Sequence, residues 1–201
     1  MKQLRTERSI GISAKTSSIN IAAAVVFTLA GSALCALAGN EARRPDLPSP
    51  LCDGLQVPDN NHVAFHVYAE GVQIYRWSGT AWVFIAPAAA LYADINHHGQ
   101  VGIHYLTVGA GPTWESNSGS KVIGMRLAAC TPDTSAIPWL KLGAISSNGP
   151  GVLEGVSFVQ RVNTVGGLAP STPGTTVGQE ADVPYTAEYF FYRAPESTEQ
   201  Q

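Results

Sequence analysis

Between residues 62 and 193 the chain consists of short segments in which apolar and polar residues alternate, or in which β-branched and aromatic residues cluster. In the first segment Val63, Phe65 and Val67 fall on one face, as expected for a strand, whose side chains have a period of two. We predict strands at residues 62–68, 72–77, 81–85, 101–108, 121–129, 139–146, 156–165 and 183–193. About eight short strands with regularly spaced turn residues predict an all-β sandwich or barrel-like domain.

The segments between these strands carry turn and breaker residues. Glu70-Gly71 and Ser78-Gly79 predict tight turns that join the first three strands in an antiparallel meander. Residues 86–94 (APAAALYAD) are the one stretch that suggests a helical turn, with a loop as the alternative. The segment from Gly111 to Glu115 is expected to form a corner after the fourth strand. The absence of long helical patterns in the domain disfavours a parallel α/β fold.

The first 38 residues have the composition of a targeting segment. Four basic residues within the first 15 positions precede an uncharged run, residues 21–38, and Ala36-Leu37-Ala38 fits an A-x-A cleavage site. This pattern predicts a secretory signal peptide over residues 1–38. A membrane anchor is the first alternative, because the apolar run is just long enough to span a bilayer. A lipoprotein attached through Cys35 is the second, although Leu34 stands where a small residue is expected.

Cleavage there leaves a lead-in, one domain and a tail. Residues 39–61 contain four prolines, which restrict the backbone, so we expect an extended lead-in before a β-domain at 62–193 and a polar tail at 194–201. The part after residue 38 holds 8 basic and 14 acidic residues, a formal charge of −6. Because it has no basic cluster, we expect no nucleic-acid partner and, after cleavage, no membrane span. The predicted location is secreted or periplasmic.

Two cysteines follow the predicted cleavage site, Cys52 and Cys130. Exported proteins reside where disulfides persist, so these two side chains are candidates for a bond that closes a long loop. Two buried thiols are the alternative, and the sequence leaves both open.

Several motifs are specific as a set. They are GVQIY, PWLKLGAI, VQRVNTVGGLAP and VPYTAEYFFYR, with GIHYLTVGAGPTWESNSGSKVIG between the first two. Together they resemble the secreted domain of unknown function numbered 3455, over most of the chain after about residue 50. The resemblance implies a secreted bacterial or fungal β-domain with no established activity, and therefore no functional residues to transfer. Relatives often have a cysteine after the first motif and another after GGLAP, and this chain has neither.

Some members of that family carry a malate dehydrogenase label, and the sequence argues against it. A dinucleotide site needs G-x-G-x-x-G between a strand and a helix, so that the pyrophosphate reaches the helix N-terminus. Here Gly109-Ala110-Gly111 is followed by Pro112, with no third glycine and no helical pattern. We therefore expect no dinucleotide and no other cofactor.

All five histidines lie between His62 and His104, which raises the question of a metal site. His62 and His66 share a strand face but lie about 13 Å apart, too far to bind one zinc ion alone. His97 and His98 are in a turn close to Asp94, and these three are the candidate ligands. Solvated turn histidines are the interpretation that we favour.

The strongest candidates for chemistry flank one loop. His104 has the residue type of a general base, and Glu115 that of its orienting partner or of an acid. No nucleophile is marked, because no G-x-S-x-G motif or catalytic-cysteine motif occurs. A structural role for Trp114-Glu115, with the indole packed in the core, is the favoured alternative.

Aromatic side chains are candidates for ligand binding. Trp114, Trp77, Trp82 and Tyr75 could stack on a sugar or another small ligand, with an exposed Trp77–Trp82 pair across the Ser78-Gly79 hairpin as the feature to look for. Core packing is the alternative for most of them. We therefore predict a ligand- or glycan-binding or surface module. The alternatives are a hydrolase-like enzyme that uses His104 and Glu115, and a purely structural envelope or stress protein.

Overall fold

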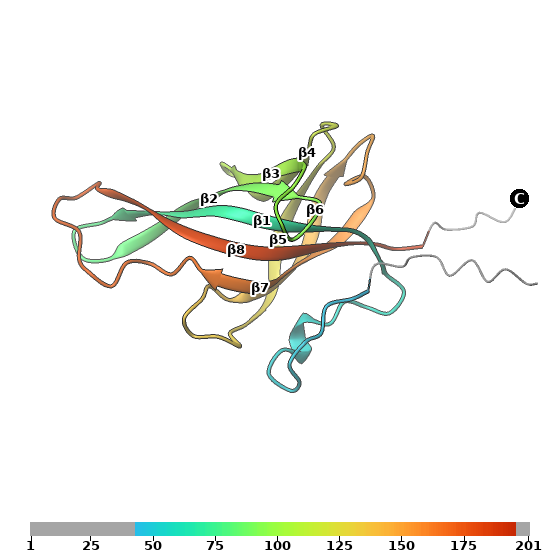
Figure 1. The fold of residues 1–201 in the computed structure, drawn as a ribbon, viewed down its shortest axis with the longest axis horizontal. Helices are drawn as coiled ribbons and strands as arrows, with labels where there is room; N and C mark the ends of the chain where they lie inside the picture. The colour runs from blue at the N-terminus through green and yellow to red at the C-terminus, as the bar shows by residue number, and fades with distance from the viewer. Residues whose placement is uncertain (1–42, 196–201) are drawn as a thin grey trace, which may run out of the picture. The chain divides into compact units, whose positions relative to one another are not determined.

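The alternating segments form eight antiparallel strands that close into a barrel. A computed structural model describes residues 43–195 of the chain. The strands are β1 (His62–Trp77), β2 (Trp82–Tyr92), β3 (Gln100–Thr107), β4 (Gly111–Ser116), β5 (Lys121–Cys130), β6 (Trp139–Asn148), β7 (Val156–Gly166) and β8 (Glu180–Arg193). Each strand pairs with the next, and β8 pairs with β1 (Figure 1). The all-β prediction is confirmed, as a closed barrel. The predicted signal peptide and residues 196–201 of the predicted tail lie outside the described residues.

The turn predicted at Glu70-Gly71 is wrong, because β1 runs straight through it. Gly71 pairs with Ala89 of β2 and with Tyr185 of β8. A Cβ atom on Gly71 would lie 2.2 Å from the carbonyl oxygen of Ala88. The glycine therefore marks the close approach of a neighbouring backbone, which is the other common reason for glycine inside a strand.

The helical turn suggested for residues 86–94 is also wrong, because β2 continues to Tyr92. Pro87 pairs with Gln73 of β1 in a part of β2 that has no partner in β3, where pairing begins only at Ala89. A proline is tolerated there because its missing N–H faces an unpaired edge. This first half of β2, together with β1 and β8, extends past the barrel as a three-stranded ribbon (Figure 1).

The corner predicted at Gly111–Glu115 is a strand, β4, which pairs with β3 and β5. The tight turn lies just before it, and Gly111 has a φ of 138°. The predicted and observed numbers of strands are both eight, because β1 unites two predicted strands and β4 adds one that was not predicted.

Strand β8 shows how the barrel is packed on both sides. Tyr189 and Phe191 belong to the apolar cluster inside the barrel, together with Trp114, whereas the alternating Phe190 and Tyr192 belong to a second cluster on its outer surface. The outer cluster also contains Cys52, Leu55, Val57, Val63, Cys130, Trp139 and Val162. Four consecutive buried aromatic residues are therefore explained by a strand that is covered on both faces.

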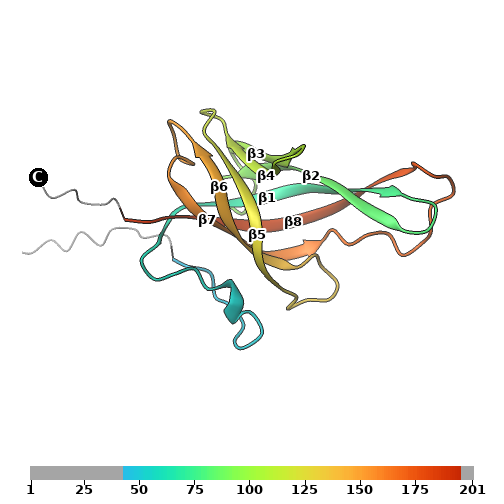
Figure 2. The ribbon, with the colours of Figure 1, turned by 180° about the vertical axis from the view of Figure 1, so that it is seen from behind.

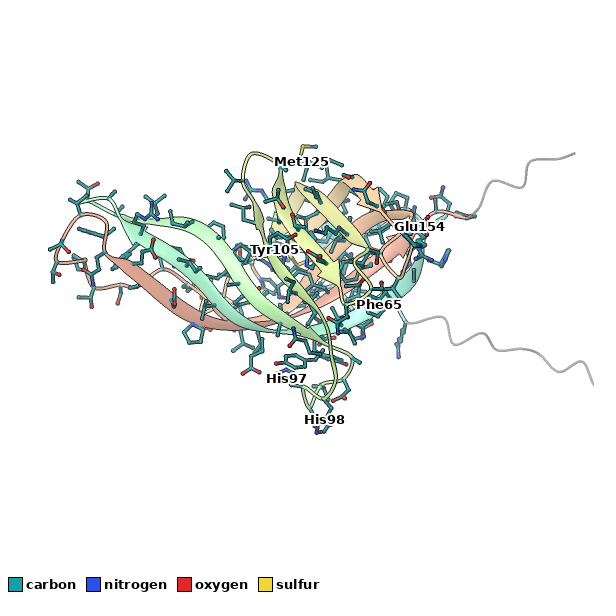
Figure 3. The ribbon with its side chains drawn as sticks, turned by 90° about the horizontal axis from the view of Figure 1, so that it is seen from above. Phe65, His97, His98, Tyr105, Met125 and Glu154 are labelled. Atoms are coloured by element: carbon teal, nitrogen blue, oxygen red, sulfur yellow. A yellow bond between two sulfur atoms is a disulfide. The ribbon has the colours of Figure 1, made fainter. Side chains whose placement is uncertain are left out.

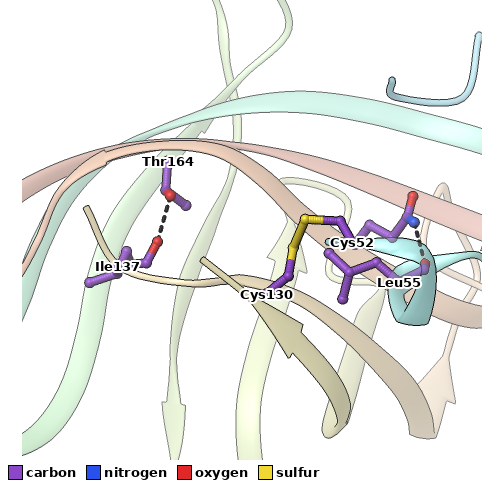
Figure 4. Close-up of a disulfide and its surroundings, with 6 residues drawn as sticks. Cys52, Leu55, Cys130, Ile137 and Thr164 are labelled. Atoms are coloured by element: carbon purple, nitrogen blue, oxygen red, sulfur yellow. Dashed lines mark hydrogen bonds between the residues drawn. A yellow bond between two sulfur atoms is a disulfide. The ribbon is translucent and has the colours of Figure 1, made fainter. Parts of the chain in front are cut away.

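The covering element of the outer cluster is the described part of the lead-in, residues 43–61, which contains no strand and has turns at 49–52 and 59–60 and one 3-10 helix (η1, Asp53–Leu55). It can be followed in blue and cyan in Figures 1 and 2. The Gln160 side chain donates a hydrogen bond to the Leu55 carbonyl (2.7 Å), and Cys52 is bonded to Cys130 at the end of β5 (Figure 4). The disulfide closes a loop of 78 residues. Among residues 43–195 no helix has the length and apolar character needed to cross a membrane.

We expect the disulfide to be a main contributor to stability. Replacing both Cys52 and Cys130 with alanine removes the cross-link that holds the lead-in on the outer cluster, and should lower the free energy of unfolding by about 2–5 kcal/mol. Denaturant unfolding of the two proteins measures the loss. A reductant should destabilise the unmodified protein to a similar extent and leave the double variant unchanged. Equal stability of the two proteins would contradict this role.

Candidate functional site

Two of the residues singled out from the sequence lie side by side inside the barrel. His104 on β3 is paired with Trp114 on β4. Their rings are stacked, with centroids 4.5 Å apart and planes 8° from parallel. Tyr189 of β8 meets both rings edge-on, at 5.2 Å and 5.3 Å. All three side chains are buried, so β3, β4 and β8 together form a rigid aromatic wall.

The position of His104 fixes its protonation state. Its Nδ1 lies 2.8 Å from the Thr113 carbonyl oxygen, and because a carbonyl can only accept, Nδ1 carries the proton. Burial lowers the pKa of His104 to about 3. The bond to Thr113 opposes this shift, and the charge of Arg161 adds to it. The ring is therefore neutral near pH 7, with Nε2 as a hydrogen-bond acceptor.

Glu115, the expected partner of His104, lies on the other side of the sheet. It pairs with Ile103, one residue before His104, so its side chain is outside the barrel. There it accepts a hydrogen bond from the Tyr105 hydroxyl (2.9 Å) and forms an ion pair with Lys121 (3.0 Å). Hydrogen bonds from Lys121 and then Tyr105 lower the pKa of Glu115. The structure does not bring His104 and Glu115 together as an acid–base pair.

The aromatic wall forms one side of a cavity of about 340 Å³ at the mouth of the barrel. Each of the eight strands contributes at least one side chain to the lining of the cavity. Most of these side chains are apolar or aromatic. They are Tyr75, Phe84, Pro87, Leu106, Pro112, Trp114, Ile137, Pro138, Leu140, Leu142 and Tyr189, joined by Gln73, His104, Arg126 and Arg161. The Tyr75 hydroxyl donates a hydrogen bond to the Gly167 carbonyl (2.7 Å).

Several polar atoms beside this site make no hydrogen bond of strict geometry with the described residues. Gln73 Nε2, Trp114 Nε1 and the Tyr189 hydroxyl are buried without a hydrogen bond, and all three residues line the cavity. The hydroxyl of Tyr185, close to Tyr189 on β8, is in the same situation. Buried polar groups are nearly always satisfied, and each unsatisfied one costs about 1–3 kcal/mol. Here Tyr185 interacts with Gln73 and Tyr189, and Tyr189 with Trp114 and Arg161, so the groups form one polar network beside the cavity.

The Trp77–Trp82 pair lies apart from this cavity, where β1 and β2 meet at the end of the ribbon. The ring centroids are 5.5 Å apart. Trp82 Nε1 donates to the Thr172 carbonyl (2.8 Å), and Gly174 lies so close to Trp77 that a Cβ atom there would be 2.5 Å from the indole. The loop between β7 and β8 therefore covers part of the pair, and both indoles are half-buried.

The candidate metal ligands lie on the loop between β2 and β3, where Figure 3 labels His97 and His98. His97 Nδ1 pairs with Glu70 of β1 (2.8 Å), and its ring stacks on Tyr92. His98 Nδ1 lies 3.4 Å from Asp94. The two histidines thus have different carboxylate partners, and no group of three His, Cys, Asp or Glu suited to a metal occurs within residues 43–195.

The sequence model of the family described as "Protein of unknown function (DUF3455)" matches residues 58–193. The chain belongs to this family. The resemblance seen in the sequence motifs is thereby confirmed. No curated protein and no solved structure matches the chain.

Within this family member, sequence reasoning found Tyr75, His104 and Trp114 but missed Gln73, Arg161 and Tyr189. Gln73 carried a signal, because the period of two along β1 places it on the same inward face as Val67, Ala69 and Tyr75. A polar residue at an inward position is the anomaly that points to a site.

The neutral state of His104 predicts a pH effect on stability. Its folded-state pKa lies below the unfolded value of about 6.5, so the unfolded state binds the proton first as the pH falls. The stability linked to this group is complete above about pH 6.5 and is lost as the pH falls toward 3. Between pH 7 and pH 5 the loss from this one group should be about 2 kcal/mol.

Denaturant unfolding at the two pH values tests this expectation. His104→Phe keeps a ring against Trp114 and should be about 2 kcal/mol less sensitive to the change in pH than the unmodified protein. His98→Gln, at a side chain that is 77% exposed, is the control and should behave like the unmodified protein. An unchanged pH sensitivity in His104→Phe would show that the histidine titrates normally.

Proposed function

We propose that this protein is an exported binding protein that takes one small, largely apolar ligand into the cavity at the mouth of the barrel. The observation that carries the proposal is the cavity itself, which all eight strands line with mainly apolar side chains and with a few polar ones, from Gln73, His104, Arg126 and Arg161. Small-molecule sites are concave, mostly apolar and provided with a few placed polar groups. An eight-stranded barrel has an interior that is either filled by side chains or able to hold one small ligand.

Binding accounts for the cavity better than catalysis does. His104 is a neutral acceptor whose Nδ1 proton is held by Thr113, and no described carboxylate lines the cavity beside it. A glycan platform at Trp77 and Trp82 is less favoured, because the β7–β8 loop covers part of both rings. Export is supported by the composition of residues 1–38, and a disulfide suits an oxidising compartment.

The neutral dye N-phenyl-1-naphthylamine, whose fluorescence rises in apolar surroundings, tests the cavity directly. We expect it to bind the full chain at a single site. Leu106→Trp places a larger ring in the cavity and should weaken binding by about tenfold or more, because the space is then filled.

Ile103→Trp is the matched control. Ile103 lies on the same strand, three residues away, but faces outward and is 42% exposed, so this variant should bind the dye normally. Circular dichroism and thermal melting check that both variants fold. Absence of dye binding by the unmodified protein, or equal binding by both variants, would overturn the proposal.

A further inference from the structure

Arg161 on β7 is a cation without a counter-ion. It is partly buried and lines the cavity. Its Nε and one terminal nitrogen donate to the Pro138 carbonyl, at 3.2 Å and 2.8 Å. No carboxylate pairs with it among residues 43–195, and the cavity lining contains two arginines but no aspartate or glutamate. Cations shielded from water are normally paired, since leaving one unpaired costs free energy.

The field of Arg161 reaches every titratable aromatic group around the cavity. Burial raises the pKa of the Tyr75, Tyr185 and Tyr189 phenols, and the positive charge of Arg161 opposes this rise in all three. The same charge contributes to the low pKa of His104. The charged side chains that line the cavity, Arg126 and Arg161, are both cationic, so the lining carries a net positive charge.

Neutral hydrogen-bonding groups lie close to this charge. Arg161, Tyr185 and Trp114 are near enough to the Tyr189 phenol to influence its pKa, and Gln73 has the same relation to Tyr185. No bond of strict geometry joins these groups, but they interact with one another and with Arg161, so they form one polar network beside the cavity. A cation surrounded by neutral donors is the arrangement that holds a carboxylate, which offers only acceptors.

We propose that the ligand of this cavity is an apolar carboxylate whose acid group is held by Arg161 and the neighbouring donors, while its body lies against the aromatic wall. This inference rests on the proposed binding function. The volume of about 340 Å³ is near the lower end of the range for small-molecule sites, about 300–1,000 Å³, which favours a compact aromatic or short aliphatic acid. The neutral His104 ring carries no charge, and its Nε2, an acceptor, donates nothing to the anion, so the acid group is assigned to Arg161 and not to the histidine.

Arg161 also has a structural explanation, which the experiment must separate from binding. Its two bonds to the Pro138 carbonyl fasten the loop between β5 and β6, so its removal affects stability in either case. A purely structural arginine would be indifferent to the charge of the ligand. The preference between a charged ligand and a neutral one of the same shape is therefore the quantity to measure.

Displacement of N-phenyl-1-naphthylamine from the full chain by 2-naphthoate and by 2-naphthamide supplies that comparison, because the two competitors differ mainly in charge. We expect naphthoate to compete about tenfold more strongly than naphthamide, as for a hydrogen-bonded charge pair. In Arg161→Met, which keeps the length of the side chain, the preference should disappear. Arg76→Met removes an arginine that pairs with Glu180 away from the cavity, and should retain it.

The outcomes separate the two proposals. Dye binding with equal competition by both naphthalene compounds overturns the carboxylate inference and leaves the binding cavity in place. A preference that persists in Arg161→Met assigns the acid group elsewhere and also overturns it. Failure of the dye to bind overturns both proposals. If Arg161→Met does not fold, the comparison of the two competitors on the unmodified protein still decides the question.

Discussion

Closure of the sheet is the constraint on which the rest of the structure depends. In a closed barrel each strand residue faces either the interior or the outside, and adjacent residues face opposite ways. That rule separates His104 from Ile103 and Trp114 from Glu115, although each pair is adjacent in sequence. Two candidate residues that look like an acid–base pair in the sequence are thereby placed on different sides of the sheet, and the histidine is left with an aromatic neighbour instead.

The local sequence was sufficient to predict the class of fold and the positions of most strands. It was insufficient where one residue type serves two purposes. Gly71 has the appearance of a turn residue, but it lies where the backbone of Ala88 passes too close for a side chain. Pro87 and the alanines around it suggest a helical turn or loop, whereas they lie in β2, where Ala86, Pro87 and Ala88 pair with β1 alone. Both cases depend on a neighbouring strand, which no local pattern contains.

The site was partly visible for a related reason. Tyr75, His104 and Trp114 are conspicuous by residue type, and the structure places all three at the cavity. Arg161 and Tyr189 are not conspicuous, because each lies in an ordinary strand pattern and reaches the cavity only when β7 and β8 close the barrel. A site assembled from distant strands is encoded in the register between them, which cannot be derived from one sequence.

The buried polar groups of residues 43–195 divide into two kinds, those with well-formed hydrogen bonds and those without. Gln160 and Thr164 have partners, since they donate to the Leu55 and Ile137 carbonyls and so fix the lead-in and the β5–β6 loop (Figure 4). Gln73, Trp114, Tyr185 and Tyr189 each have a buried polar atom without a hydrogen bond of strict geometry, and Arg193 Nε, away from the cavity, is the other such atom among the described residues. The four groups beside the cavity interact with one another instead.

The pairing of β1 with β8, the seam that closes the barrel, has a consequence for how this chain folds. Fourteen positions of β1 pair with β8, and the His66–Glu188 contact on that seam joins residues 122 apart in the sequence. Contacts so distant form late, because the loop between them must close first. Until β8 arrives, β1 presents a long unpaired edge, which is a template for pairing with other chains. By pairing with β1, strand β8 therefore also protects the edge of β1 from aggregation.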